Sequence, residues 1–153
     1  MNPHTIFVLG DPAAQGSKRI VRTKGGRTIM LEQSKKVKPW REAVAAAAMQ
    51  SKCPMHEGDV VMQIRVLFAR PASHFNKAGE VRHTAPARPG YTDCDKLARA
   101  ICDALAGIAY HNDRQVAALS VDRAWSPGPS SATIKVAACP PEGGWVYEHP
   151  PAP

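Results

Sequence analysis

The chain has 153 residues, enough for one domain that buries its apolar surface without disulfide bonds or metal staples. Twenty Lys and Arg residues against thirteen Asp and Glu residues give a formal net charge of +7 at pH 7, which favours polyanionic partners. No apolar run approaches the roughly 18 residues that a membrane span needs, and the first residues lack the pattern of a signal peptide, so we expect a cytoplasmic protein with no membrane partner.

The N-terminal part of the chain predicts a strand, a basic hairpin and a helix, in that order. Residues 5–9 are a β-branched and aromatic run that ends at a Gly-Asp-Pro loop. Residues 20–31 predict a hairpin around a Gly-Gly turn. A helix is expected from Val37 to about Ser51, with Trp40 at helical spacing on its core face.

The middle of the chain combines a regular strand with a long irregular segment. Residues 60–68 alternate so that five apolar side chains share one face, which predicts a strand. Residues 70–92 are rich in proline and cationic residues and poor in apolar ones, so we expect a mobile basic arm on the substrate side. Residues 93–106 predict a helix with one buried stripe, stopped by Gly107.

The C-terminal part predicts two strands and a tail. Residues 115–125 and 132–138 are strand-like runs joined by a Ser-Pro-Gly-Pro-Ser segment. Residues 139–153 form a Pro/Gly-rich C-terminal tail that is not expected in the core. The predicted fold class is α+β: a single domain over residues 1–138, with a small mixed β-sheet and two α-helices packed on one face.

Three aspartates lie around the second predicted helix: Asp93 and Asp95 at its start, and Asp113 after the turn that follows it. Taken singly, each is explained as a helix cap or a turn residue, and an N-cap contributes about 0.5–2 kcal/mol. A second carboxylate two residues from the first adds repulsion, however, and a basic chain gives no general reason for an acidic cluster. Hard cations such as Mg²⁺ take carboxylate oxygens as ligands. We therefore expect the three carboxylates to converge at one end of the helix and the following strand, around Mg²⁺ (with Mn²⁺ as a substitute), for phosphodiester hydrolysis.

Several cations have expected roles around this cluster. Arg99, one helical turn from Asp95, is placed to stabilise charge on the scissile phosphate. The alternative for Arg99 is an ion pair with Asp95 or Asp103 that only supports the helix. Lys96 is expected on another side of the helix, in contact with the DNA backbone. The basic segment that precedes the first helix and enters it is either a solvated face or, as its density favours, a DNA-binding surface. Its residues expected at DNA are Lys18, Arg19, Lys35, Lys36, Lys38 and Arg41.

Four short motifs in residues 91–116 carry a resemblance to a known family: Asp93-Cys94-Asp95-Lys96-Leu97, Arg99, Asp103-Ala104-Leu105-Ala106-Gly107 and Asn112-Asp113-Arg114-Gln115-Val116. They resemble the RusA-type Holliday junction resolvase (crossover junction endodeoxyribonuclease) family. The stretches Gly10-Asp11-Pro12-Ala13-Ala14-Gln15-Gly16-Ser17-Lys18-Arg19 and Lys35-Lys36-Val37-Lys38-Pro39-Trp40-Arg41 look like its phage/prophage-like branch. The resemblance covers about residues 5–138.

This resemblance implies a homodimeric, Mg²⁺-dependent endonuclease that resolves four-way DNA junctions by paired symmetric nicks, in recombination and repair. Asp93, Asp95 and Asp113 would lie at the metal. Two positions depart from the family pattern: Asn112 stands where Asp is frequent, and Arg99 stands where the founding member has Lys.

Other interpretations remain open from the sequence. A non-catalytic branched-DNA-binding protein would use the aspartates only as caps, and a nuclease for other branched replication intermediates, such as flaps, would share the same motifs. A zinc site built from Cys94, Cys102 and His111 is less favoured, because its spacing matches no common structural site. His111 is expected to be a surface turn residue, since a hard-cation site prefers oxygen ligands.

Overall fold

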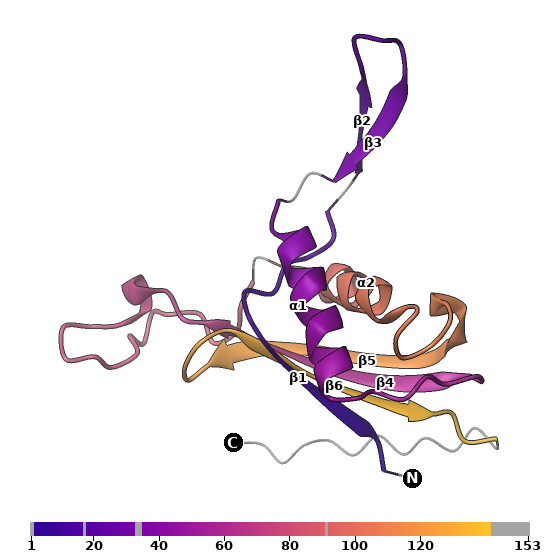
Figure 1. Ribbon diagram of the computed structural model, residues 1–153. Coiled ribbons are helices and arrows are strands. Elements are labelled where there is room, and N and C mark those ends of the chain that lie inside the picture. The colour runs from indigo at the N-terminus through magenta and orange to yellow at the C-terminus, as the bar shows by residue number, and fades with distance from the viewer. Residues whose placement is uncertain (1, 17, 33–34, 91, 142–153) are drawn as a thin grey trace.

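The computed structural model describes residues 2–16, 18–32, 35–90 and 92–141. Its main body is a four-stranded mixed sheet in the order β1-β6-β4-β5, and two helices, α1 and α2, both lie on one face of this sheet (Figure 1). The bounds are β1 His4–Leu9, α1 Val37–Gln50, β4 Val60–Ala69, α2 Cys94–Leu105, β5 Val116–Ser126 and β6 Ser131–Ala138. The α+β prediction, with a mixed sheet and helices on one face, is confirmed.

The sheet has β4 at its centre. This strand pairs antiparallel with β6 and parallel with β5, while β1 pairs antiparallel with the other edge of β6. Although β5 and β6 are joined by a short Pro/Gly-rich segment, they are not neighbours, because β4 lies between them. The parallel pairing of β4 with β5 means that both strands start at the same end of the sheet.

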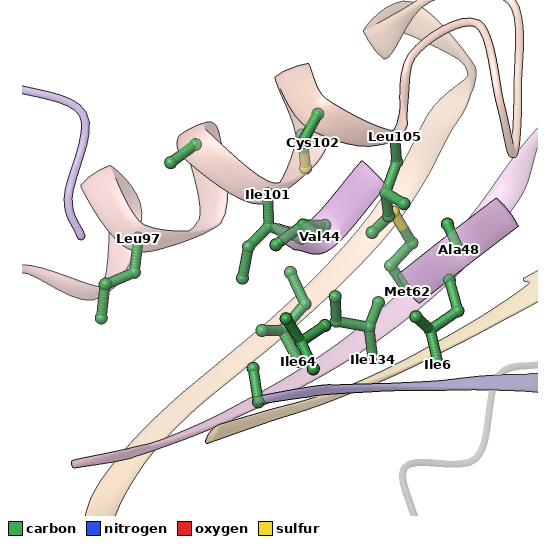
Figure 2. Packing of buried hydrophobic residues seen from close by; sticks show 14 of the residues in the cluster. Ile6, Val44, Ala48, Met62, Ile64, Leu97, Ile101, Cys102, Leu105 and Ile134 are labelled. Carbon is green, nitrogen blue, oxygen red and sulfur yellow. The ribbon is translucent and has the colours of Figure 1, made fainter. Parts of the chain in front are cut away.

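The core forms between the sheet and the helices (Figure 2). The apolar face of β4 is buried along its length, as its alternation predicts. The stripe of α2 contributes Leu97, Ile101 and Leu105, all fully buried. Trp40 of α1 is 2% exposed, so it is a core residue rather than a base-stacking platform. Each large apolar side chain buried in this way contributes about 1.5–3 kcal/mol.

The end of α2 is a tight and well-bonded return. Gly107 has φ +83, a left-handed conformation that favours glycine and ends the helix, as predicted. The buried Tyr110 hydroxyl then donates to the Cys102 carbonyl at 2.8 Å, which ties the return segment to the last turns of α2. A short 3₁₀ helix, η2 (Asp113–Gln115), leads directly into β5.

The predicted basic hairpin is present as a separate two-stranded sheet. Strands β2 (Lys18–Arg22) and β3 (Thr28–Glu32) pair antiparallel and project away from the main body (Figure 1). The side chain of Ile20 is 68% exposed, so the hairpin has little cover from the body of the protein.

The arm between β4 and α2 has its own local structure. It contains the 3₁₀ helix η1 (Ala72–His74) and a turn in which the Asn76 side chain accepts from the backbone N–H groups of Ala78 and Glu80, both at 2.9 Å. At its base, the Trp125 indole donates to the Pro86 carbonyl at 2.8 Å. The arm is therefore internally bonded and anchored on β5, and its mobility stays a prediction. No helix in the described residues is long and apolar enough to cross a membrane, and most of the predicted tail (142–153) lies outside them.

Candidate functional site

Asp93 and Asp95 lie at the start of α2. Asp93 is the N-cap residue, with extended backbone (φ −77, ψ 135), but its side chain makes no capping hydrogen bond. Asp95 is in the first helical turn, and both side chains are exposed. The capping explanation therefore does not account for Asp93. Two solvent-accessible carboxylates stand at the helix end where the dipole favours negative charge.

Lys96 forms an ion pair with Asp93 rather than facing away from the acidic residues. Its Nζ lies 3.1 Å from Oδ2 of Asp93, and the two side chains are 46% and 65% exposed. This pair follows from the i, i+3 spacing, because such positions are neighbours on a helix surface, and the expectation that Lys96 lies on another side of the helix from Arg99 stays a prediction. The contact of Lys96 with DNA stays a prediction.

Asp113 lies at the other end of α2. The helix has 12 residues and therefore rises about 18 Å. Asp113 follows the C-terminal end of α2 and precedes Val116, which pairs with Val60 at the start of β4. Thr92, which precedes Asp93, borders instead on Phe68 and Ala69 at the end of β4. Asp113 thus lies near the start of β4, whereas Asp93 and Asp95 lie near its end.

The expected convergence of the three aspartates is not reproduced within one chain. Among the residues that the structure describes, no three His, Cys, Asp or Glu side chains group as a metal site. The physical reason is the direction of the chain: the return after α2 is tight, so β5 begins beside the helix end and not beside its start. The roles of the three aspartates stay predictions.

The electrostatic surroundings of Tyr110 indicate where Asp113 lies relative to α2. The pKa of Tyr110 is raised, first by burial, then by Cys102, and further by the carboxylates of Asp103 and Asp113. The pKa of the buried Cys102 thiol is also raised, mainly by burial, with the same two carboxylates adding to it. Both effects place Asp113 near the last turns of α2. The zinc interpretation gains no support from the geometry, because Cys94, Cys102 and His111 do not group as a metal site among the described residues.

Gln115 holds the turn that carries Asp113. Its side-chain oxygen accepts from the backbone N–H groups of His111 at 2.7 Å and Asn112 at 3.2 Å. Its side-chain nitrogen donates to the carbonyls of His56 at 2.9 Å and Gly58 at 2.8 Å. No role of its own is expected for Gln115 from the sequence. The signal was present as Asn112-x-x-Gln115, the spacing of a capping box.

Arg99 is exposed on α2. Within the described residues, the ion pairs of the structure do not join Arg99 to Asp95 or to Asp103. The alternative role for Arg99, an ion pair that only supports the helix, is therefore not seen among the described residues. The guanidinium is available to a ligand.

A polar surface cavity of about 450 Å³ lies beside the start of α2. It is lined by the loop after β1, the residue before α1, the end of β4, the residue before Asp93 and the residue before β6: Asp11, Pro12, Ala13, Ala14, Lys36, Phe68, Ala69, Thr92 and Ser130. The loop after β1 is fixed against α2, because the backbone N–H of Gln15 donates to the Lys96 carbonyl at 3.1 Å. Lys36, which lines the cavity, contributes a positive charge close to Asp93 and Asp95.

The other predicted DNA-binding residues are dispersed around this region. Lys35 and Lys36 are exposed before α1, and Lys38 is exposed and lies 4.0 Å from Glu42. Arg41 is half-buried on α1. Lys18 and Arg19 belong to β2, but their side chains lie outside the described part of the structure.

Comparison with known protein families identifies a match over most of the chain. The family model of endodeoxyribonuclease RusA matches residues 10–137, which is most of the chain and includes both the Asp93/Asp95 pair and Asp113. No curated protein matches the chain.

Proposed function

Because the chain belongs to the RusA endodeoxyribonuclease family, whose members resolve Holliday junctions, we propose that it is a Mg²⁺-dependent endonuclease that resolves four-way DNA junctions by paired symmetric nicks, in recombination and repair. The observation that carries the proposal is a family match that spans both acidic segments. We place this activity in the cytoplasm, with Mn²⁺ as an alternative metal.

The carboxylates at the start of α2 fit a hard divalent cation. Mg²⁺ is usually held by one or two carboxylates, with water and substrate phosphate completing the shell. Asp93 and Asp95 provide two exposed carboxylates within the first turn of one helix. When bound, the ion would activate water for attack and neutralise charge on the phosphate.

A homodimer would bring together the carboxylates that lie apart within one chain. Asp113 lies at the far end of α2 from Asp93, so a symmetric partner is the simplest way to bring a third carboxylate to the pair. In such a dimer, Asp113 of the partner subunit would stand beside Asp93 and Asp95, and the reciprocal contact would form a second, identical site. Two identical sites related by a two-fold axis are what paired symmetric nicks require.

The cations near α2 have complementary roles in this proposal. The Arg99 guanidinium would stabilise charge that develops on the scissile phosphate. Lys96 neutralises Asp93 in the free protein and would be released to the DNA backbone when a cation occupies that carboxylate. Lys36 and the basic hairpin would bind flanking phosphates, which supply most of the sequence-independent affinity for DNA.

Subunit complementation tests the proposal directly. We expect Asp93→Asn, Asp95→Asn and Asp113→Asn each to abolish cleavage of a labelled four-way junction in Mg²⁺ while leaving binding intact or tighter, because repulsion of phosphate decreases. Asp93→Asn and Asp113→Asn chains, co-expressed with different tags and purified as a heterodimer, should regain nicking at one site. One composite site would then carry both defects, and the other would carry none.

Other outcomes would change the assignment. A heterodimer without activity would place all three aspartates of a site in one chain. Binding with and without EDTA but cleavage in neither, for the unaltered protein, would favour a non-catalytic branched-DNA-binding protein. Faster cleavage of a flap than of a four-way junction or linear duplex would change the substrate to another branched intermediate. A monomeric mass by light scattering together with full bilateral cleavage would refute the dimer.

A further inference from the structure

We infer that Gln115 is the positioning residue for Asp113, so that its side-chain amide sets the metal affinity of the site to which Asp113 contributes. This inference rests on the proposed function, because it concerns how strongly that site binds its cation.

The amide of Gln115 uses all of its hydrogen-bonding capacity. A primary amide has two N–H donors and one oxygen with two acceptor positions. In Gln115 both donors go to carbonyls of the loop before β4, and both acceptor positions take N–H groups of the turn before Asp113. The side chain therefore fastens the η2 turn to the loop of residues 56–58.

These bonds fix the backbone on both sides of Asp113 while leaving its carboxylate exposed. Before it, the N–H groups of His111 and Asn112 are bound to Gln115. After it, the N–H of Arg114 donates to the Asn112 side chain at 3.1 Å. The carbonyl of Asp113 itself accepts from the Val116 N–H. The carboxylate is thus presented to solvent from a turn that is held at several points.

The loop to which Gln115 binds is itself tied to the core. The N–H of His56 donates to the Ala109 carbonyl at 2.9 Å, and His56 forms a β-bridge with Tyr110, which is fully buried. A displacement of the η2 turn relative to α2 would have to break these links. Gln115 therefore connects the position of Asp113 to the rigid part of the fold.

The chemistry at this position requires an amide. In Gln115→Glu, the carboxylate still accepts from two N–H groups, but its second oxygen faces the His56 and Gly58 carbonyls and donates to neither. In Gln115→Ala, all four bonds are lost. Residues that orient a metal ligand commonly change metal affinity or activity by about 10–100-fold when mutated.

The test measures metal binding apart from catalysis. Mn²⁺ binding to the DNA-free protein, followed by electron paramagnetic resonance, should weaken about 10-fold or more in Gln115→Glu and in Gln115→Ala. The Mg²⁺ concentration for half-maximal cleavage should rise in parallel, and cleavage should recover toward the wild-type rate at high Mg²⁺. Junction binding in EDTA should not change. Gln63→Glu introduces the same charge on β4, where Gln63 borders a cavity with Lys135 and Ala137, and it should leave Mn²⁺ affinity unchanged.

A milder variant separates the effect on metal binding from a general loss of folding. Asn112→Ala removes the exposed side-chain acceptor of the η2 turn, which takes the Arg114 N–H and the Gln115 N–H of the capping box, and it should weaken Mn²⁺ binding in the same direction. Variants that melt earlier but bind Mn²⁺ as tightly as the unaltered protein would assign Gln115 to stability alone and overturn the inference. An unaltered protein that binds no Mn²⁺ would overturn the proposed function and the inference together, and that failure is distinguishable because it appears without any substitution.

Discussion

Replacing Arg99 with alanine should separate transition-state stabilisation from helix stability. The side chain is exposed, and the ion pairs of the described residues leave it unjoined to Asp95 and Asp103. Alanine is the best helix former, so the free energy of unfolding should change by less than about 0.5 kcal/mol. If the guanidinium stabilises charge on the scissile phosphate, the cleavage rate should fall about 10²–10³-fold, which is about 2.7–4 kcal/mol of activation free energy.

The assay is single-turnover cleavage of a labelled junction with enzyme in excess, measured beside thermal unfolding of the same preparation. Arg99→Lys is the matched variant, because it keeps the charge and loses only the planar, bidentate geometry. We expect it to retain most activity, with some loss if the guanidinium grips phosphate through two bonds. An alanine variant that cleaves normally and melts about 2–4 °C earlier, the shift expected for about 1 kcal/mol, would refute the catalytic role and assign Arg99 to the helix.

Three further predictions concern DNA binding and the fold. Junction binding should fall steeply with salt, and the slope of log affinity against log salt should decrease by about 0.9 for each phosphate contact removed. The variant for this test carries alanine at three cations near the start of α1: Lys35, Lys36 and Lys38. An unchanged slope would show that these side chains face solvent in the complex. Tyr110→Phe should lower the free energy of unfolding by about 0.5–1.5 kcal/mol, since it removes a buried hydrogen bond to the Cys102 carbonyl, and an unchanged denaturation midpoint would contradict this. Because folding raises the pKa of Tyr110, the unfolded chain should ionise first above about pH 10, so stability should fall there in the unaltered protein and less steeply in Tyr110→Phe.

The elements of the fold were predictable because their signals are local. The period of two in residues 60–68 and the period of 3.6 in α2 each follow from burying one face against a common core. The order of strands in the sheet was not predictable in the same way, because it depends on which strand is most buried. Val61, on the second face of β4, is almost fully buried as well, and this favours the central place that β4 takes between β5 and β6.

The site was predictable in residue type but not in arrangement. The motif indicated which aspartates to consider, yet their relative positions depend on where the chain re-enters the sheet after α2. The hydrogen bond of Tyr110 closes that return at the C-terminal end of the helix, and the parallel pairing of β5 with β4 then fixes Asp113 there. Neither feature has a local signature. The Lys96 to Asp93 ion pair did have one, in the i, i+3 spacing.

The separation of the acidic residues has an electrostatic consequence within one chain. Three clustered carboxylates without a cation repel one another, as they would in the proposed dimer, whereas within the described residues of one chain Asp113 stands apart and Asp93 is paired with Lys96. An exposed ion pair of this kind contributes only about 0–1 kcal/mol, so a divalent cation can replace the ammonium at low cost. Under the proposed function, metal binding at Asp93 would release the charge of Lys96 at the position where the DNA backbone arrives. Metal binding and DNA binding would then strengthen each other. The cation replaces Lys96 as the partner of Asp93, and the DNA phosphate replaces Asp93 as the partner of Lys96.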